Sequence, residues 1–265
     1  MKFETKCVQA GWDPKNGEAR VLPIYQSTTF KFDSAQHVAD LFDLKVGGHF
    51  YTRLSNPTLD YVEQRIAALE GGVGAMLTSA GQAASMISLL TVAHAGDHIV
   101  SSSEIYGGTV NLFGVTLEKL GIQFTWVHPD ASDAEIEAAI RPNTKAIFGE
   151  TLANPALSVL DVERWAKVAH KNGLPLILDN TFPTPYLCRP FEWGADIVVH
   201  ASTKYLDGHA VSLGGIIVDS GNFDWAASGR FKDFTEPDPS YHGLVYTQAF
   251  GKMAYIVKAR AQLMR

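Results

Sequence analysis

The sequence predicts an α/β fold with a mostly parallel sheet sandwiched by helices. First, apolar runs typical of buried strands alternate with helical patterns from about residue 75 onward. Second, polar residues able to carry chemistry repeatedly follow these runs, at the strand ends where such sheets place ligands. Third, 265 residues are enough for one large domain with a sizeable core, or for a domain and a half.

Composition and charge argue against several classes of protein. The hydrophobic fraction of 46% and the charged fraction of 19% are those of an ordinary globular protein. The net charge of −6 and the pI near 5.8 argue against a nucleic-acid or anionic-membrane surface. No apolar stretch reaches the ~18 residues of a membrane span, and no hydrophobic run follows the N-terminus as it would in a signal peptide.

Cysteine and histidine spacings argue against metal sites. Cys7 and Cys188 lie far apart and match no zinc or CxxC pattern, so we expect free thiols in a cytoplasmic protein. The nine histidines lack the spacing of metal ligands, and no GxSxG elbow of a serine hydrolase is present.

The first 55 residues show no clear alternation of strands and helices. Residues 20–32 are expected to be extended, and Ser34 to Val46 to form a short helix. Such an arm has little core pattern of its own, so we expect it to pack against a neighbour. Tyr51 and Arg53 would lie on one side of an extended chain, although a simple surface pair is the alternative interpretation.

A helix is well signalled after the arm. Asn56 is a plausible N-cap, Pro57 suits the first turn, and Gly71 suits the position after the end. Its apolar stripe consists of Leu59, Val62, Ile66 and Leu69.

The next unit passes from a strand to a helix at Gly81, where helix N-terminal amides attract anions. Gly72 and Gly74 have no third glycine at the offset of a GxGxxG motif, so a dinucleotide site is not predicted. Ser132 with Glu135 predicts a capping box. Further strands are expected at 97–101, 123–127, 145–149, 176–179, 196–199 and 213–218, and further helices at 109–120 and 161–171.

Lys204 lies between two apolar runs and is the residue with the strongest chemical implication. Burial disfavours an ammonium, so a buried Lys204 would have a lowered pKa and act as an amine nucleophile for a Schiff base. Ser202 and Thr203 precede it and have hydroxyls that suit a phosphate, and Asp179 ends another strand. This combination is the one that pyridoxal 5'-phosphate (PLP) requires. Taken singly, the lysine is also compatible with a solvated loop and the aspartate with a helix cap.

Two other strand ends carry candidate residues. Tyr106 is positioned to stack on a flat ring and carry a proton, or simply to pack. Asn154 is positioned to donate its amide to a ring oxygen, and alone it is a weak signal.

Five motifs in one order carry a family resemblance. They are Tyr51-Thr-Arg53 with Ser55-Asn-Pro-Thr58, Tyr106-Gly-Gly-Thr109, Glu150-Thr-x-x-Asn154-Pro, Asp179-Asn-Thr, and Ser202-Thr-Lys-Tyr-x-x-Gly-His209. Together they resemble the cysteine/methionine-metabolism PLP-dependent enzymes of the cystathionine γ-synthase type. The segment Glu236 to Gly243 resembles the O-acetylhomoserine sulfhydrylase branch more than the lyases.

The resemblance implies a role for each matching residue. Lys204 would form the Schiff base and shuttle protons, Asp179 would keep the pyridine nitrogen protonated, and Tyr106 would stack on the ring. Asn154 would bond the ring's 3-oxygen. The phosphate would be held by Gly81, Gln82 and Thr203, with Ser202 as a further candidate. Tyr51 and Arg53 of a neighbouring subunit would also reach it, which implies a homodimer or homotetramer with shared active sites.

The resemblance also implies fold type I of the PLP-dependent transferases and γ-replacement of acetate in O-acetyl-L-homoserine by sulfide, giving L-homocysteine. The implied division is an arm at 1–55, a large PLP-binding domain at 56–245, and at 246–265 the start of a helix leading to a further domain. Two departures are evident: Ala201 stands where the family often has a serine, and no residue here matches the arginine that binds the substrate carboxylate. The alternatives are a methionine γ-lyase or cystathionine lyase, or a catalytically incomplete PLP-binding fragment.

Overall fold

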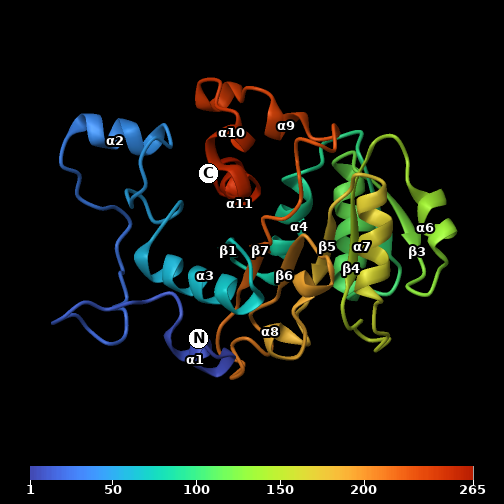
Figure 1. Cartoon of the computed structure of the whole chain (residues 1–265), viewed down its shortest axis with the longest axis horizontal. Coiled ribbons are helices and arrows are strands. Elements are labelled where there is room, and N and C mark those ends of the chain that lie inside the picture. Colours follow the sequence, from blue (N-terminus) through green and yellow to red (C-terminus); the bar gives the residue numbers. More distant parts are fainter. Residues whose placement is uncertain (265) are drawn as a thin grey trace.

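A seven-stranded sheet runs through the computed structural model, which describes residues 1–264 (Figure 1). The spatial order of the strands is β1-β7-β6-β5-β4-β2-β3. Their bounds are β1 Gly74–Thr78, β2 His98–Ser102, β3 Gln123–Val127, β4 Thr144–Glu150, β5 Leu176–Asp179, β6 Ile197–His200 and β7 Gly215–Asp219.

The mostly parallel sheet is confirmed. The pairs β2/β3, β2/β4, β4/β5 and β5/β6 are parallel, whereas β7 is antiparallel to both of its neighbours, β6 and β1. The carboxyl ends of β2, β4, β5 and β6 therefore meet at one edge of the sheet, which is the edge where parallel α/β sheets bind ligands.

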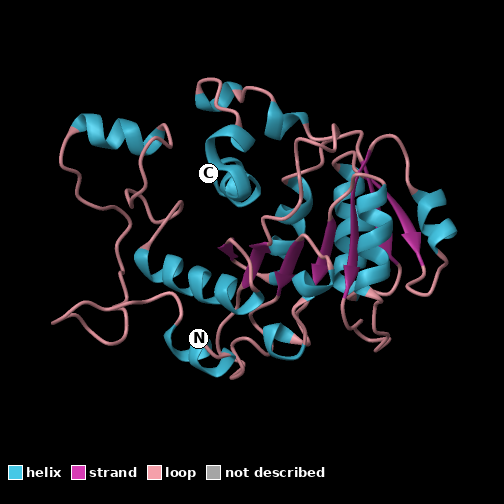
Figure 2. Ribbon diagram, viewed as in Figure 1, coloured by secondary structure: helices cyan, strands magenta, loops and turns pink. Residues whose placement is uncertain are grey.

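Helices cover both faces of the sheet (Figure 2). The helical segments are α1 Phe3–Gln9, α2 Ala35–Phe42, α3 Pro57–Glu70, α4 Gly81–Leu90, α5 Gly107–Asn111, α6 Asp133–Ala139, α7 Val162–Lys171, α8 Thr184–Leu187, α9 Lys232–Thr235, α10 Tyr246–Phe250 and α11 Ala254–Leu263, with a π-helical turn at Leu112–Leu117 and 3-10 turns at Pro190–Trp193, Pro239–Tyr241 and Gly251–Met253.

Side chains alternate between two cores along each strand. Phe148 of β4 and Ile177 of β5 belong to the core beneath α4, α5 and the C-terminal helices. Ile147 and Leu178, their neighbours in sequence, belong to the core beneath α6 and α7. This period of two follows from the strand geometry, and here both faces are buried because helices cover both.

The caps predicted for α3 and α6 are confirmed. The Asn56 side chain accepts the Thr58 N–H at 2.9 Å, and Gly71 ends α3 with φ +84°. Ser132 and Glu135 form the reciprocal capping box of α6.

Three predicted elements differ in detail. The helix expected to reach Val46 ends at Phe42, because Leu44 adopts a left-handed φ of +58°. The helix expected over 109–120 begins at Gly107 and continues through the π-helical turn. The last strand begins at Gly215 rather than 213.

The N-terminal arm stands partly away from the sheet. Figure 1 shows α2 and the extended segment before it projecting from the body, whereas α1 lies near α3. Val21 and Ile24 in the extended segment are 72% and 84% exposed, so the arm presents apolar side chains to its surroundings.

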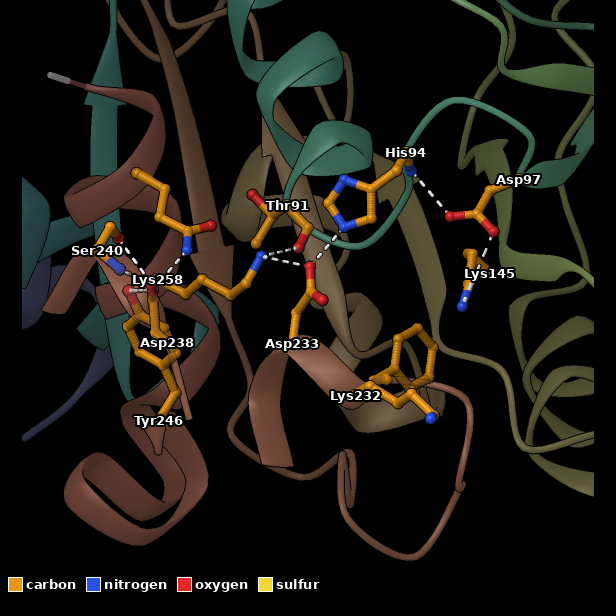
Figure 3. A network of polar contacts seen from close by, with 12 residues as sticks. Thr91, His94, Asp97, Lys145, Lys232, Asp233, Asp238, Ser240, Tyr246 and Lys258 are labelled. Carbon is orange, nitrogen blue, oxygen red and sulfur yellow. Dashed lines mark hydrogen bonds and ion pairs between the residues drawn. The ribbon is translucent and has the colours of Figure 1, made fainter. Parts of the chain in front are cut away.

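The C-terminal segment is part of the larger core. Tyr255 and Ile256 of α11 are buried there, and Lys258 of the same helix is 1% exposed. Figure 3 shows the ammonium of Lys258 between Thr91 and Asp233, at 2.8 Å from the Thr91 carbonyl oxygen and 3.7 Å from the Asp233 carboxylate.

Asp233 also contacts His94, so one carboxylate links α9, α11 and the turn after α4 (Figure 3).

Among residues 1–264 there is no helix long and apolar enough to cross a membrane. The described residues bring together no cluster of three or more His, Cys, Asp or Glu side chains able to hold a metal ion.

Candidate functional site

A pocket with a volume of about 810 Å³ lies at the carboxyl ends of the parallel strands. It collects residues that are far apart in the sequence but follow neighbouring strands. Seven of the residues predicted for the site line it: Gly81, Gln82, Tyr106, Asn154, Asp179, Thr203 and Lys204.

Gly81 begins α4 and forms the back of the pocket. A β-carbon at this position would lie 2.5 Å from the β-carbon of Ala201, far closer than van der Waals contact. The segments that follow β1 and β6 can pack this closely because the residues that meet, Gly81 and Ala201, are small. The next residue, Gln82, donates its side-chain amide to the Thr109 hydroxyl at 2.9 Å, which ties α4 to α5.

Asp179 is the last residue of β5 and is half-buried in the pocket. Its Oδ1 accepts the Thr181 N–H at 2.9 Å and also the Thr181 hydroxyl. Burial raises the pKa of Asp179, while the Thr181 donors and the nearby His200 oppose that rise.

Glu150 is a pocket residue that was not predicted. It ends β4, is 5% exposed, and accepts the Tyr106 backbone N–H at 2.7 Å. Burial, together with the charge of Asp179, raises the pKa of Glu150 to about 8. A sequence signal existed, because a carboxylate ends an apolar strand here just as Asp179 does.

Tyr106 follows β2 and lies at the mouth of the pocket with 47% of its surface exposed. Its ring folds over Gly108, where a β-carbon would lie 2.5 Å from the ring. The ring is thus half-exposed where it lines the pocket.

The predicted burial of Lys204 is wrong. Its side chain is exposed, because residues 201–214 form a turn and loop at the surface rather than continuing the buried strands. It nevertheless lines the pocket.

The two hydroxyls before Lys204 are placed differently. Thr203 lines the pocket, and its hydroxyl bonds both the carbonyl and the N–H of Gly214 at 3.1 Å. Ser202 is not among the lining residues; its hydroxyl packs against Gly214.

Tyr51 and Arg53 are likewise outside the pocket. They lie in the arm, where the guanidinium of Arg53 sits 5.0 Å from the centre of the Tyr51 ring. Both residues are exposed, so within a single chain they form a surface pair.

A buried polar chain supports the strand ends. His200, the last residue of β6, donates to Glu70 of α3 at 2.6 Å, and neither side chain is exposed. Asn180, which follows Asp179, bonds the same Glu70 oxygen at 3.2 Å and accepts the Thr151 hydroxyl at 2.8 Å. The residues next to Glu150, Asp179 and Ala201 are thus anchored to one another.

Comparison with known proteins finds relatives along the entire chain. The O-acetyl-L-homoserine sulfhydrylase of Leptospira meyeri is 49% identical over 275 residues, covering 100% of this chain and 62% of that protein. The homocysteine synthase of Schizosaccharomyces pombe is 48% identical and covers 99% of this chain and 62% of its own length. The chain thus spans about 62% of the length of these curated relatives.

Solved structures show the same architecture. One from Campylobacter jejuni, described as an O-acetylhomoserine (thiol)-lyase, matches with a TM-score of 0.89 at 32% identity and covers 100% of this chain and 71% of that one. It contains N'-pyridoxyl-lysine-5'-monophosphate. The cystathionine γ-lyase of Lactobacillus plantarum, complexed with L-serine, matches with a TM-score of 0.76 at 31% identity and covers 100% and 64%.

A family model agrees with these individual matches. It extends over residues 4–254 and therefore includes the arm, all seven strands and every residue of the pocket. The chain belongs to the Cys/Met metabolism PLP-dependent enzyme family.

Proposed function

We propose that this chain is the cofactor-binding part of an O-acetylhomoserine sulfhydrylase, which converts O-acetyl-L-homoserine and sulfide into L-homocysteine and acetate. The observation that carries the proposal is the convergence of Lys204, Asp179, Tyr106 and Asn154 in one pocket at the strand ends. The names of the Leptospira meyeri and Schizosaccharomyces pombe relatives support this reaction over a lyase reaction.

The pocket fits PLP in shape and in charge. A primary amine, a carboxylate and a helix N-terminus face one cavity, and they match the aldehyde, the ring nitrogen and the phosphate of PLP respectively. Gly81, the first residue of α4, lines the pocket, so the N-terminus of this helix is placed to bind an anion there. When bound, PLP supplies an electron sink for the bonds broken at the substrate amino acid.

Each lining residue then has a distinct task. The Lys204 amine would hold the cofactor covalently and, once released, move protons at Cα and Cβ of the substrate. The negative charge of Asp179 would keep the ring nitrogen protonated. Tyr106 would stack on the ring and assist protonation of the leaving acetate, and Asn154 would bond the 3-oxygen.

The phosphate site would be completed by Gly81, Gln82 and Thr203 of the same chain, with Ser202 as a further candidate. Tyr51 and Arg53 would reach it from a second copy, which is consistent with their exposure on the arm. The arm at 1–55 would then make subunit contacts, the domain at 56–245 would bind PLP, and 246–265 would lead into a further domain. The oligomer would be a homodimer or homotetramer.

We also propose that the enzyme works in the cytoplasm. Cys7 and Cys188 are both free, as is usual for proteins in a reducing compartment.

The test of the cofactor is reductive trapping. The purified chain is mixed with PLP, its visible absorption is recorded, and borohydride is added. The expected result is a yellow band that disappears on reduction and a pyridoxyl adduct that peptide mapping finds on Lys204. The Lys204→Ala variant should give no adduct, with Lys252→Ala, an exposed lysine of the C-terminal segment, as the matched control. Labelling spread over surface lysines, or retained in Lys204→Ala, would overturn the proposal.

A product assay tests the reaction. O-acetylhomoserine with sulfide should yield homocysteine and acetate in equal amounts. Formation of 2-oxobutanoate and a thiol from methionine would instead identify a γ-lyase. Cofactor trapping without turnover of either substrate would mean that the chain binds PLP but is catalytically incomplete.

A further inference from the structure

Glu150 and Asp179 are direct neighbours at the floor of the pocket. They are register partners at the ends of the parallel strands β4 and β5. Along each strand they are two residues beyond Phe148 and Ile177, which share one core, so both carboxylates point to the same face. Both also line the pocket.

Two carboxylates this close to each other and to a buried face do not both ionise readily near neutral pH. Asp179 is the better site for the negative charge, since it has two Thr181 donors and the favourable field of His200. The Glu150 side chain is less exposed to solvent than that of the half-buried Asp179, and burial with the charge of Asp179 raises the pKa of Glu150 to about 8. Below that pH the pair retains one proton, held on Glu150.

The other charged groups around the pair are few. From β6 and the turn after it come His200, which is paired with Glu70, and the exposed Lys204. From the loop after β2 comes Tyr106, whose backbone N–H bonds Glu150. Among the described residues, Asp179 is therefore the charged group with the main electrostatic influence on Glu150.

We propose that Glu150 and Asp179 form a pair that shares one proton, and that Glu150 releases this proton when a cationic aromatic ring nitrogen binds at Asp179. The inference rests on the proposed function, because PLP is the ligand that brings such a nitrogen. Glu150 is a positioning residue in this scheme, since it acts through Asp179 and holds the loop of Tyr106. The proton leaves to solvent, and no bond to the ligand is made or broken.

The sign of the pH dependence follows from linkage. A positive ring nitrogen favours the ionised form of Glu150, so binding releases a proton where Glu150 was protonated, below about pH 8. Ligand affinity should therefore rise with pH, by up to about tenfold per pH unit, and level off above pH 8. Glu150→Gln, which cannot ionise, should lack this component.

The first test uses the cofactor-free protein and needs no ligand. Infrared spectra recorded as a function of pH should contain the carbonyl band of a protonated carboxyl group that disappears near pH 8. Glu150→Gln should remove that band, and Glu137→Gln, which changes a carboxylate of α6 bonded to Lys171, should keep it. Absence of a Glu150-dependent band at neutral pH would overturn the pair, whatever the cofactor experiments show.

The second test measures binding of pyridoxine 5'-phosphate, whose alcohol cannot condense with Lys204. Calorimetry in buffers of different ionisation enthalpy gives the protons released. Protons that the ligand itself gains or loses are the same for all variants, so they cancel when the proton release of two variants is compared. Wild type and Glu137→Gln should release up to about one proton more than Glu150→Gln near neutral pH.

Equal proton release by wild type and Glu150→Gln would overturn the inference and leave the proposed function intact. Failure of the wild-type chain to bind the probe at any pH would overturn the proposed function and the ligand-driven step together. Circular dichroism and thermal unfolding confirm that Glu150→Gln is folded before either comparison is made.

Discussion

The imidazole of His200 and the carboxylate of Glu70 are 2.6 Å apart and wholly buried. This contact joins α3, which follows the arm, to β6, which leads into the Lys204 turn. A buried charge that loses its partner is strongly destabilising, whereas a surface pair contributes little.

We therefore expect His200→Ala to lower the free energy of unfolding by about 3 kcal/mol, since Glu70 would keep only the Asn180 amide as a donor. The double variant with Glu70→Ala should lose less than the sum of the two single losses. Urea denaturation measures the loss for each of the two single variants and for the double variant. Glu163→Ala, which breaks an exposed pair with Lys167, is the control with a small effect. Additive losses would mean that the two buried groups are not coupled.

Gly81→Ala should damage the pocket by crowding alone. The new methyl group would fall 2.5 Å from the Ala201 β-carbon and push the α4 N-terminus away from the Lys204 turn. We expect a loss of stability of about 1–3 kcal/mol and at least a tenfold weaker affinity for pyridoxine 5'-phosphate. Gly107 begins another helix, α5, and a methyl group there would meet nothing within 4 Å. Gly107→Ala should therefore leave the free energy of unfolding almost unchanged. Unchanged stability of Gly81→Ala would show that the two backbones separate freely.

Asp219 should make stability fall as the pH rises. Burial raises its pKa from 3.8 to about 7, so the folded chain binds more protons than the unfolded chain between these values. The free energy of unfolding then decreases with pH across that window and stays low above it. Asp219→Asn keeps an oxygen for the Gly221 N–H and should be more stable than wild type by roughly 1–3 kcal/mol at pH 8, with little difference at pH 4.

Urea unfolding at the two pH values checks this prediction. Asp224→Asn changes an exposed carboxylate but keeps Asp219, so it is the matched control and should lose stability between pH 4 and pH 8 as wild type does. If Asp219→Asn were less stable than wild type at pH 8, the predicted direction of the pH effect would be wrong.

Lys258 gives the opposite trend at alkaline pH. Burial lowers its pKa from the usual 10.5, so the unfolded chain binds more protons there and stability contributed by this group rises with pH. Lys258→Met removes that rise. The stability of wild type relative to the variant should increase as the pH rises toward 10.5, the ordinary pKa of a lysine. Lys252 lies on an exposed turn, so the stability of Lys252→Met should change with pH as that of wild type does. If both variants differed from wild type in the same way, burial of Lys258 would not be the cause.

Much of the pocket could be predicted because chemistry-bearing residues follow buried strands. Asp179 ends the buried strand β5, Tyr106 and Asn154 closely follow β2 and β4, and parallel strands bring those positions to one edge. Glu150 opens one of the motifs and ends an apolar strand, but no role was predicted for it, because its importance comes from its register with Asp179, and strand register is not visible in a single sequence.

The exposure of Lys204 was mispredicted for a related reason. A residue between two apolar runs is buried only if the connection is short, and here residues 201–214 form a surface loop. Tyr51 and Arg53 raise a different difficulty, because the role expected of them involves a second copy of the chain, to which one sequence gives no direct clue.

The position of β1 has a consequence for synthesis on the ribosome. β1 is made first among the strands but lies at the edge of the sheet, where its partner is β7, the last strand to be made. At about 5–20 residues per second, β7 emerges roughly 10–30 seconds after β1. Gly81 can meet Ala201 only after β6 and the residue that follows it have been made, so a nascent chain exposes an unfinished pocket until then.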